Sequence, residues 1–290
     1  MASMREIKRR RVSIQSTQQI TKAMKLVATV KLQKARQRAE NSKPYFQYMY
    51  RTVTSMLAKA GTVEHPYLRV GRSDKVGIVV ITSNRGLAGG YNSNVAKLVQ
   101  ASGYGKENVR IYAVGKKGTD MLSRRGYEIV ANFPDVIEEP TFEDAKRISE
   151  RLLQDFMNGE IGEIYVAYTE FKNTVVHIPK MMKLLPIDSK EVQEEHSEEE
   201  NVDKLALMNF EPSEEEAIGL LIPKYVTSIL YGAFVEAVAS ENGARMQAMD
   251  SATNNAEEII SDLELKYNRA RQGAITQELT EIIAGADAIG

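Results

Sequence analysis

The sequence predicts an α/β domain inserted between two long helices that pair as an antiparallel coiled coil. Residues 4 to 43 contain neither proline nor glycine, and residues 224 to 290 contain no proline, so both ends of the chain favour helices. Between them the apolar pattern changes to short strand-like runs that alternate with helical segments. This alternation is typical of a domain with a mainly parallel sheet.

The N-terminal helix, segment 1–60, is expected to bury one narrow face. Its apolar residues recur at spacings of three and four, and they are Ile20, Met24, Val27, Ala28, Leu32, Ala35 and Ala39. Because proline lacks a backbone donor, we expect the helix to end or kink at Pro44, with a continuation that Gly61 stops.

The C-terminal helix, segment 217–290, has the same spacing. Its face comprises Ile222, Val226, Ile229, Ala233, Ala237, Ser240, Ala244, Ala248, Ala252, Ile259 and Leu263. Some sixty helical residues reach roughly 90 Å, which no compact domain can cover, so the two terminal helices are expected to wind around each other. Gln and Lys interrupt the apolar heptads, and we interpret the imperfect seam as a sign that partners surround part of the rod.

The central segment 74–190 is expected to form a Rossmann-like α/β domain. Strands are expected at 76–82, 109–114, 128–133 and 164–169, and helices near 93–101, 118–125 and 142–157. Residues 175–185 are expected to form an antiparallel edge strand, because Pro179 would be awkward in a central one.

Charge is segregated along the chain although the net charge is only -1. Residues 1 to 43 hold twelve Lys or Arg against Glu6 and Glu40, whereas the connecting segment 191–216 is strongly acidic. Charge runs of this kind usually form solvated faces and loops. A basic helix is also compatible with binding to nucleic acid, but residues 1 to 43 contain no aromatic residue and the acidic segment would repel phosphate, so no nucleic acid is predicted.

The glycine-rich loop at residues 82–92 follows the first expected strand and opens a helix, where related folds bind phosphate. Its glycines do not match the dinucleotide pattern, and Lys116 stands where an acidic ribose ligand would be needed. A nucleotide-dependent enzyme is the alternative that this loop leaves open. We predict no cofactor and no catalytic residue, and interpret the loop as part of the domain's own architecture.

Metal and thiol chemistry are not expected. The chain has no cysteine, and its three histidines are isolated from one another, so no metal site is predicted. No secretory signal and no membrane-spanning segment are expected either.

The C-terminal tip, residues 282–290, is apolar nearly all round and carries a single charge. A helix end of this kind has to be buried by something, and a ring-shaped sleeve of partner subunits would bury it without fixing one orientation.

These residues resemble the gamma subunit of F-type ATP synthases from end to end. The family signature matches residues 275–288 (ITQELTEIIAGADA), and a second block matches residues 240–249 (SENGARMQAM) with 252–255 (ATNN). The opening helix matches at 7–9 and 17–24, and the domain loop at 83–94 has Ala88 where many members have Cys.

The resemblance implies a rotating central stalk inside a hexamer of alternating alpha and beta subunits, with the epsilon subunit and the c-ring around its base. It would couple ion-driven rotation of the c-ring to ATP synthesis or hydrolysis at the beta subunits, with no catalytic site of its own. Residues that match beta-subunit contacts are Met24, Lys25, Arg245, Arg271, Gln272, Thr276 and Glu278. Phe210 and Glu211 match the contact with the c-ring and epsilon.

The same resemblance implies a location. Plastid members carry an inserted cysteine pair that this chain lacks, and no transit peptide is expected, so a bacterial origin is favoured. The chain would then be peripheral at the cytoplasmic face of the plasma membrane and attached only through the complex, driven by protons or sodium ions.

Overall fold

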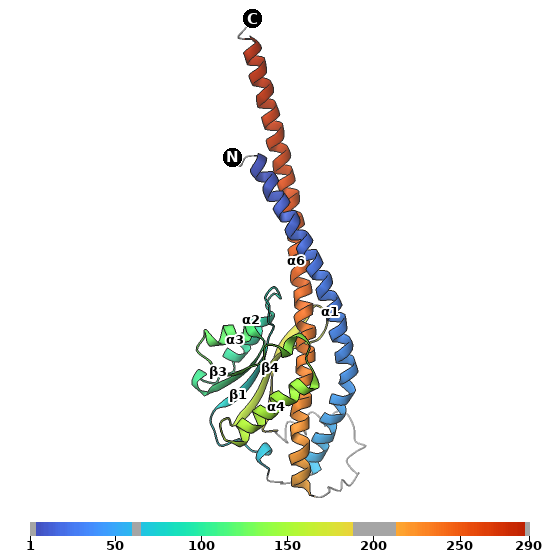
Figure 1. The fold of residues 1–290 in the computed structure, drawn as a ribbon, viewed down its shortest axis with the longest axis vertical. Coiled ribbons are helices and arrows are strands. Elements are labelled where there is room, and N and C mark those ends of the chain that lie inside the picture. The colour runs from blue at the N-terminus through green and yellow to red at the C-terminus, as the bar shows by residue number, and fades with distance from the viewer. Residues whose placement is uncertain (1–3, 60–64, 188–212, 288–290) are drawn as a thin grey trace. The chain divides into compact units, whose positions relative to one another are not determined.

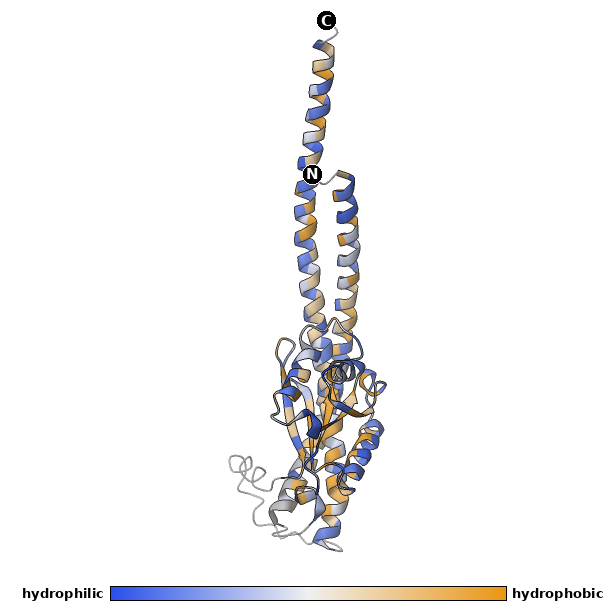
Figure 2. Ribbon diagram, turned by 90° about the vertical axis from the view of Figure 1, so that its left-hand side faces the viewer, coloured by the Kyte–Doolittle hydropathy of each residue, from blue (hydrophilic) through white to orange (hydrophobic). Residues whose placement is uncertain are grey.

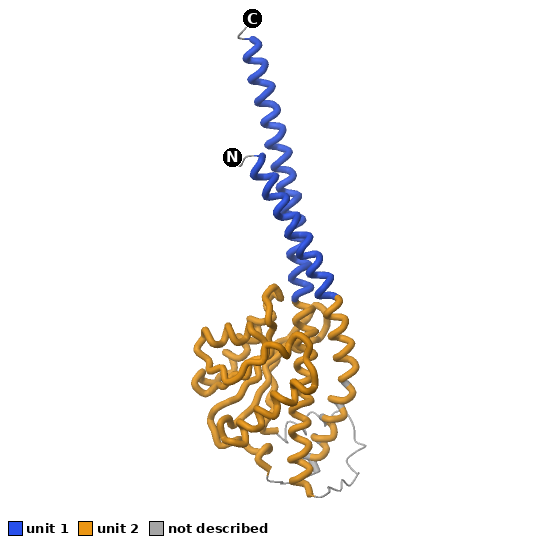
Figure 3. Tube along the Cα trace, viewed as in Figure 1, with its two compact units in different colours: residues 1–29, 245–290 blue, residues 30–244 orange. Residues whose placement is uncertain are grey.

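A computed structural model describes residues 4–59, 65–187 and 213–287. The chain divides into two compact units, which Figure 3 distinguishes by colour. Unit 1 contains residues 1–29 and 245–290, and unit 2 contains residues 30–244. Each unit is described by itself below.

Two long helices contribute to both units. Helix α1 spans Met4–Lys59 and helix α6 spans Glu214–Asp287. Of the end or kink expected at Pro44, an end is wrong and the expected continuation is confirmed, because α1 runs through this residue to Lys59. Pro44 cannot donate to the carbonyl of Glu40, but both residues are exposed, so water can satisfy that carbonyl.

Unit 2 contains a five-stranded sheet in the order β3-β2-β1-β4-β5 (Figure 1). The strands are β1 Val76–Ile81, β2 Val109–Val114, β3 Glu128–Asn132, β4 Glu163–Phe171 and β5 His177–Leu185. The pairs within β3-β2-β1-β4 are parallel, and β5 pairs antiparallel with β4. The expected antiparallel edge strand is therefore confirmed, with Pro179 in it.

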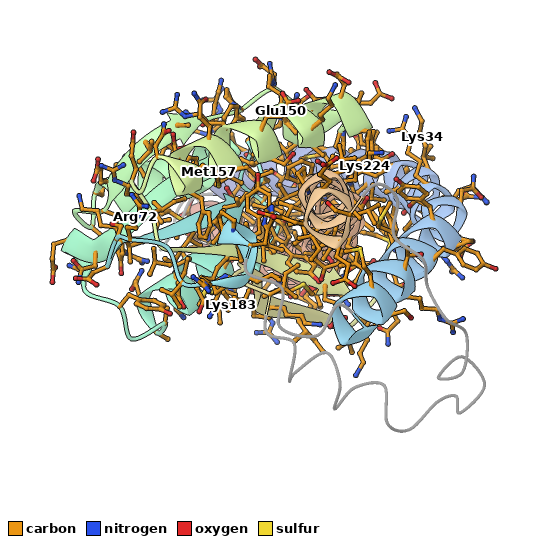
Figure 4. All side chains as sticks on the ribbon, turned by 90° about the horizontal axis from the view of Figure 1, so that it is seen from below. Lys34, Arg72, Glu150, Met157, Lys183 and Lys224 are labelled. Carbon is orange, nitrogen blue, oxygen red and sulfur yellow. The ribbon has the colours of Figure 1, made fainter. Side chains whose placement is uncertain are left out.

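Helices cover both faces of the sheet. They are α2 Tyr91–Gln100, α3 Lys116–Ser123 and α4 Phe142–Met157, and short 3-10 turns lie at Pro66–Leu68, Lys106–Asn108 and Val136–Glu138. Ile78 and Val80 of β1 pack with α2 and α3, whereas Val79 and Ile81 pack with α4 and α6. In Figure 4, Glu150 on α4 and Lys183 on β5 mark opposite sides of the unit.

The first part of α6 is the main core helix of unit 2. Its fully buried residues include Ile218, Ile222, Val226, Leu230, Phe234 and Ala237. By length and composition alone, α6 is also the one helix of the described residues that is apolar enough to cross a membrane, and 56% of that stretch is buried. A core helix gives the same signal, and the orange residues of α6 beside the sheet in Figure 2 lie in this core.

Polar contacts attach α6 to the rest of unit 2. The hydroxyls of Thr227 and Ser149 on α4 lie 2.6 Å apart, and Ser240 donates to the Thr169 carbonyl at 3.0 Å. The Tyr91 hydroxyl donates to the Ala237 carbonyl at 3.2 Å. Bonds from α4, β4 and the start of α2 thus fix the position of α6 along its axis.

A buried carboxylate joins α4 to the centre of the sheet. Asp155 is only 2% exposed, and it accepts a hydrogen bond of 2.6 Å from the Tyr112 hydroxyl and one of 3.1 Å from Arg151 Nε. Burial, together with this bond, raises the pKa of Tyr112 above its ordinary value. The phenol therefore stays protonated and keeps donating to the carboxylate.

Removal of this donor should destabilise unit 2. Because Tyr112→Phe leaves Asp155 buried with one donor fewer, we expect the free energy of unfolding of the full chain to fall by about 1–3 kcal/mol. Tyr104→Phe is the matched control, because the Tyr104 hydroxyl donates to Glu163, which also accepts from Lys183 and Tyr165. Urea denaturation measures both, and equal losses for the two variants would contradict this account.

His177 packs against α6 at Gly243, a position of the helix that has no side chain. A Cβ built on Gly243 would lie 2.5 Å from His177 Nε2, so glycine permits the contact. This nitrogen is buried without a hydrogen-bond partner, and burial lowers the pKa of His177 below its ordinary value of 6.5. Burial also lowers the pKa of His65, which the charge of Glu215 partly opposes.

These lowered pKa values predict a loss of stability in acid. Below pH 6.5 these histidines bind more protons in the unfolded chain than in the folded chain, because folding lowers their pKa values. The free energy of unfolding should therefore fall as the pH decreases from 6.5. The slope of this free energy against pH measures how many more protons the unfolded chain binds. Between pH 7 and 5, His177→Gln should lower that number by a fraction of one proton, and so should His65→Gln. An unchanged slope in both variants, measured by denaturation at each pH, would contradict the lowered pKa values of these two half-buried histidines.

Candidate partner surfaces and the domain loop

The loop after β1 is bonded to the N-terminus of α3. Asn84 Oδ1 accepts from the backbone of Lys116 at 3.0 Å, and the Ser83 carbonyl accepts from Lys117 at 3.0 Å. Thr82 Oγ1 accepts from the backbone of Gly118 at 2.8 Å. The first N–H groups of α3 are therefore used to join the loop to this helix.

Gly115 lets the loop and the following helix meet. Its φ of 100° is unfavourable for other residues, and a Cβ there would lie 2.0 Å from the Thr82 carbonyl oxygen. On the other side of the loop, Asn92 Oδ1 accepts from the Ser83 backbone at 2.9 Å. These contacts support the interpretation of the loop as architecture. Among the residues that the structure describes, no group of three or more potential metal ligands occurs.

In unit 1 the two helices pair antiparallel along heptad seams. On α1 the buried and half-buried seam residues are Met4, Ile7, Arg11, Ile14, Gln18, Thr21, Lys25 and Ala28. On α6 they are Met249, Thr253, Ala256, Ile260, Leu263, Tyr267 and Ala270. Spacings of three and four alternate along both seams, as in coiled coils.

Four polar contacts join the two seams. The hydroxyls of Thr21 and Thr253 lie 2.8 Å apart, and Lys25 Nζ donates to Asp250 Oδ1 at 2.5 Å. Arg11 lies 3.6 Å from a Glu264 oxygen and stacks over the ring of Tyr267 at 5.9 Å. Figure 1 shows the two helices side by side near the N-terminus, and α6 continuing alone from there to the C-terminus.

In this part of α1 the expected apolar face is wrong at Ile20 and Val27 and confirmed at Ala28, because the seam runs one residue later, through Thr21 and Ala28. Ile20 and Val27 are 57% and 60% exposed, whereas Thr21 and Ala28 are buried. Each residue turns a helix by about 100°, so this shift moves the apolar pair off the seam. Alanine at position 28 permits a closer approach of α6 than valine would. On α6, Ile259 is likewise 42% exposed, and its neighbours Ala256 and Leu263 form the seam.

Ile20 and Val27 face outward on α1, and together with Val12 they form an exposed apolar stripe. A second exposed stripe lies on the end of α6, at Ile275, Leu279, Ile282 and Ile283, with exposed fractions of 48 to 63%. All side chains from 271 to 287 are exposed, and Figure 2 shows apolar and polar residues mixed along this end. Apolar stripes that the chain itself does not cover are typical of interaction surfaces.

The residues implied by the resemblance lie at different depths in unit 1. Arg271, Gln272, Thr276 and Glu278 are exposed, whereas Met24, Lys25 and Arg245 are half-buried. Phe210 and Glu211 fall outside the described residues. The pairing of Lys25 with Asp250 was not anticipated from the sequence, although the heptad spacing of Ile7, Ile14, Thr21 and Ala28 would have indicated that Lys25 lies on the seam.

Comparison with known proteins gives a consistent result. A family model described as ATP synthase matches residues 3–289. The chain is 62% identical to an ATP synthase gamma chain of Lachnoclostridium phytofermentans, with 100% of both chains covered. It is 42% identical to a sodium ion specific ATP synthase gamma chain of Acetobacterium woodii, with 99% of both covered.

Solved structures share the fold. A chain in the central stalk and c-ring of the Tetrahymena thermophila mitochondrial ATP synthase aligns with a TM-score of 0.60 at 25% identity, covering 80% of this chain and 99% of that one. A chain of the Euglena gracilis mitochondrial ATP synthase aligns with a TM-score of 0.73 at 20% identity, covering 99% and 94%.

A long helix pair with an inserted α/β domain and uncovered apolar stripes defines a stalk subunit of a larger assembly. The chain belongs to the ATP synthase gamma chain family. It is a central-stalk subunit of an ATP synthase, whose rotation couples ion flow to ATP synthesis, and its association with the membrane is through that complex.

The loop architecture predicts unequal effects of two alanine substitutions. Gly115→Ala should lower the free energy of unfolding by about 3 kcal/mol or more, because the new Cβ collides with the Thr82 backbone. Gly126 has a comparable φ of 85°, but a Cβ added there would have no atom within 4 Å, so Gly126→Ala should cost only about 1 kcal/mol. Thermal unfolding of both variants checks the difference, and a smaller loss at position 115 would be inconsistent with the described contact.

Proposed function

We propose that this chain is the shaft that turns inside a hexamer of alternating alpha and beta subunits and is driven from below by the c-ring. The outward apolar stripes of unit 1 are the observation that carries the proposal. Val12, Ile20 and Val27 on α1, and Ile275 and Leu279 on α6, present apolar side chains that unit 1 does not bury. A surrounding sleeve of subunits would cover them in every rotational position.

The proposed mechanism is mechanical. The shaft is asymmetric, since α1 is rich in Lys and Arg whereas the C-terminal tip, residues 282–290, carries a single charge. Each of three otherwise equivalent catalytic sites on the beta subunits would meet a different side of the shaft, so the angle of the shaft selects which site opens. Catalysis belongs to the beta subunits in this proposal, and the chain contributes no catalytic residue.

We propose two sets of contact residues. Contacts with the beta subunits comprise Met24, Lys25, Arg245, Arg271, Gln272, Thr276 and Glu278. The exposure of the last four supports their assignment. Lys25 is still 39% exposed while it pairs with Asp250, so a partner carboxylate can approach the same ammonium group. Phe210 and Glu211 are proposed to contact the c-ring and the epsilon subunit.

The proposal divides the chain into shaft segments 1–60 and 217–290, an α/β domain at 74–190 and an acidic connection at 191–216. It places the complex at the cytoplasmic face of a bacterial plasma membrane. The coupling ion is a proton or sodium, and the name of the Acetobacterium woodii relative gives sodium for that protein. Sodium dependence of ATP hydrolysis in membranes that carry the complex distinguishes the two.

The first experiment is co-purification of the tagged chain with alpha and beta subunits, followed by measurement of rotation during ATP hydrolysis. Removal of the residues after Thr276 should leave unit 2 folded, because that unit ends at Ala244. Torque and coupling should fall, since the apolar stripe at Leu279, Ile282 and Ile283 is lost.

A matched pair of substitutions separates the tip from general effects of surface charge. Leu279→Asp should weaken rotation under load, whereas Val175→Asp, on a domain residue that is 70% exposed, should not. Full torque from the truncated chain and from Leu279→Asp would contradict the proposed bearing role of the tip.

A further inference from the structure

We infer that a polar layer within unit 1 fixes the register of α1 against α6. The polar layer comprises Thr21 and Lys25 of α1 with Asp250 and Thr253 of α6. Its two interhelical contacts are the hydroxyl pair at 2.8 Å and the Lys25–Asp250 ion pair at 2.5 Å. The inference rests on contacts inside unit 1 and does not depend on the proposed function.

The apolar seam residues do not specify a register by themselves. Met249, Ala256 and Leu263 are buried and follow one another at heptad spacing, as Ile7 and Ile14 do on α1. A slip of one heptad therefore places apolar residues opposite apolar residues again. Apolar heptads generally leave register to polar positions within the seam.

The threonine pair disfavours a slip in either direction. Thr21 is 8% exposed, and a one-heptad slip would replace Thr253 beside it by Met246 or by Ile260. Thr21 and Thr253 can each donate to a carbonyl of their own helix, at 3.0 and 2.7 Å, so one hydroxyl donates back while the other donates across. A slip removes the bond across and leaves a hydroxyl against an apolar side chain.

Each ion pair disfavours one direction of slip. When α6 shifts one way, Lys25 faces Gly243 in place of Asp250 and loses its partner. When α6 shifts the other way, Lys25 meets Glu257, but Arg11 then faces Arg271. The described register thus has two alternatives, a slip of one heptad in each direction. Only in the described register are the threonine contact and both ion pairs favourable. Specific interfaces generally disfavour wrong pairings in this way.

The register has a consequence for the surface of unit 1. It sets how far α6 extends past the start of α1, and Figure 3 shows that α6 is the longer helix in this unit. The exposed residues 272–287 correspond to about 24 Å of helix. A slip of one heptad would change that length by about 10 Å and would displace the two outward stripes relative to each other.

Disulfide trapping in the full-length chain tests the inference. The natural chain has no cysteine, so introduced thiols report alone. Gln18→Cys is combined in separate chains with Met249→Cys, Ala256→Cys or Leu263→Cys, three buried α6 positions one heptad apart. In the described register the Ala256→Cys combination should cross-link about tenfold more than the other two, as expected for loss of a hydrogen bond and an ion pair on slipping.

The decisive variant makes the layer apolar, with Thr21→Val, Thr253→Val, Lys25→Met and Asp250→Met. All three cross-links should then approach equal yield, while the thermal midpoint stays the same or rises, since apolar seams are more stable and less specific. Thr21→Ser with Thr253→Ser keeps the hydroxyl pair and should keep the tenfold preference.

Two results would overturn the inference. One is an unchanged tenfold preference in the apolar variant, which would mean that the register is set by the apolar seam or by the packing of α1 on α6 in unit 2, where Phe46 contacts Tyr231. The other is loss of every cross-link together with a lower thermal midpoint, which would mean that the polar layer only holds the helices together.

Discussion

A helix of 74 residues has more side-chain surface than one small domain can bury, and this constraint shapes the rest of the molecule. The first third of α6 is covered on several sides by the sheet and α4, with Phe234 and Ile222 fully buried. In the described part of unit 1 only α1 covers α6, so the buried residues of α6 there lie along a single seam. Beyond residue 270 nothing in the described chain covers the helix. The gradient from complete burial to complete exposure along one helix explains why the same element serves as domain core, coiled-coil partner and free surface.

The sequence was sufficient to predict the strands, the antiparallel edge and the two long helices, because period and proline content act locally. It was insufficient where a tertiary contact decides. Ile20 and Val27 fit an apolar seam as well as Thr21 and Ala28 do, and only the partner helix decides between them. The pair Tyr112–Asp155 joins residues 43 positions apart, which no local pattern reveals. At Pro44 the tendency of proline to end a helix did not prevail. The carbonyl that loses its donor lies at an exposed position, and the helix continues on both sides.

The C-terminal residues, Lys25 and the glycine-rich loop could be predicted from the sequence to different degrees. Motifs indicated the contact residues proposed for the C-terminal end, and residues 271–278 are exposed, as a contact surface requires. The same motifs gave no sign that Lys25 pairs within its own chain, because a motif records residue identity and not competition for a charge. The glycine-rich loop shows the converse. Its resemblance to a phosphate loop is local, and its hydrogen bonds to α3 give Ser83 and Asn84 a structural role instead.

The alternating spacing of the seam also gives the helix pair a hand. A straight α-helix turns once in 3.6 residues, whereas the seams of unit 1 repeat every 3.5, so the two helices must coil around each other in a left-handed sense to stay in contact. A left-handed rope responds differently to the two directions of twist, because one tightens its turns and the other opens them. The two directions of twist are therefore not equivalent for this helix pair, and the positions of Ile7, Ile14, Thr21 and Ala28 determine which direction tightens it.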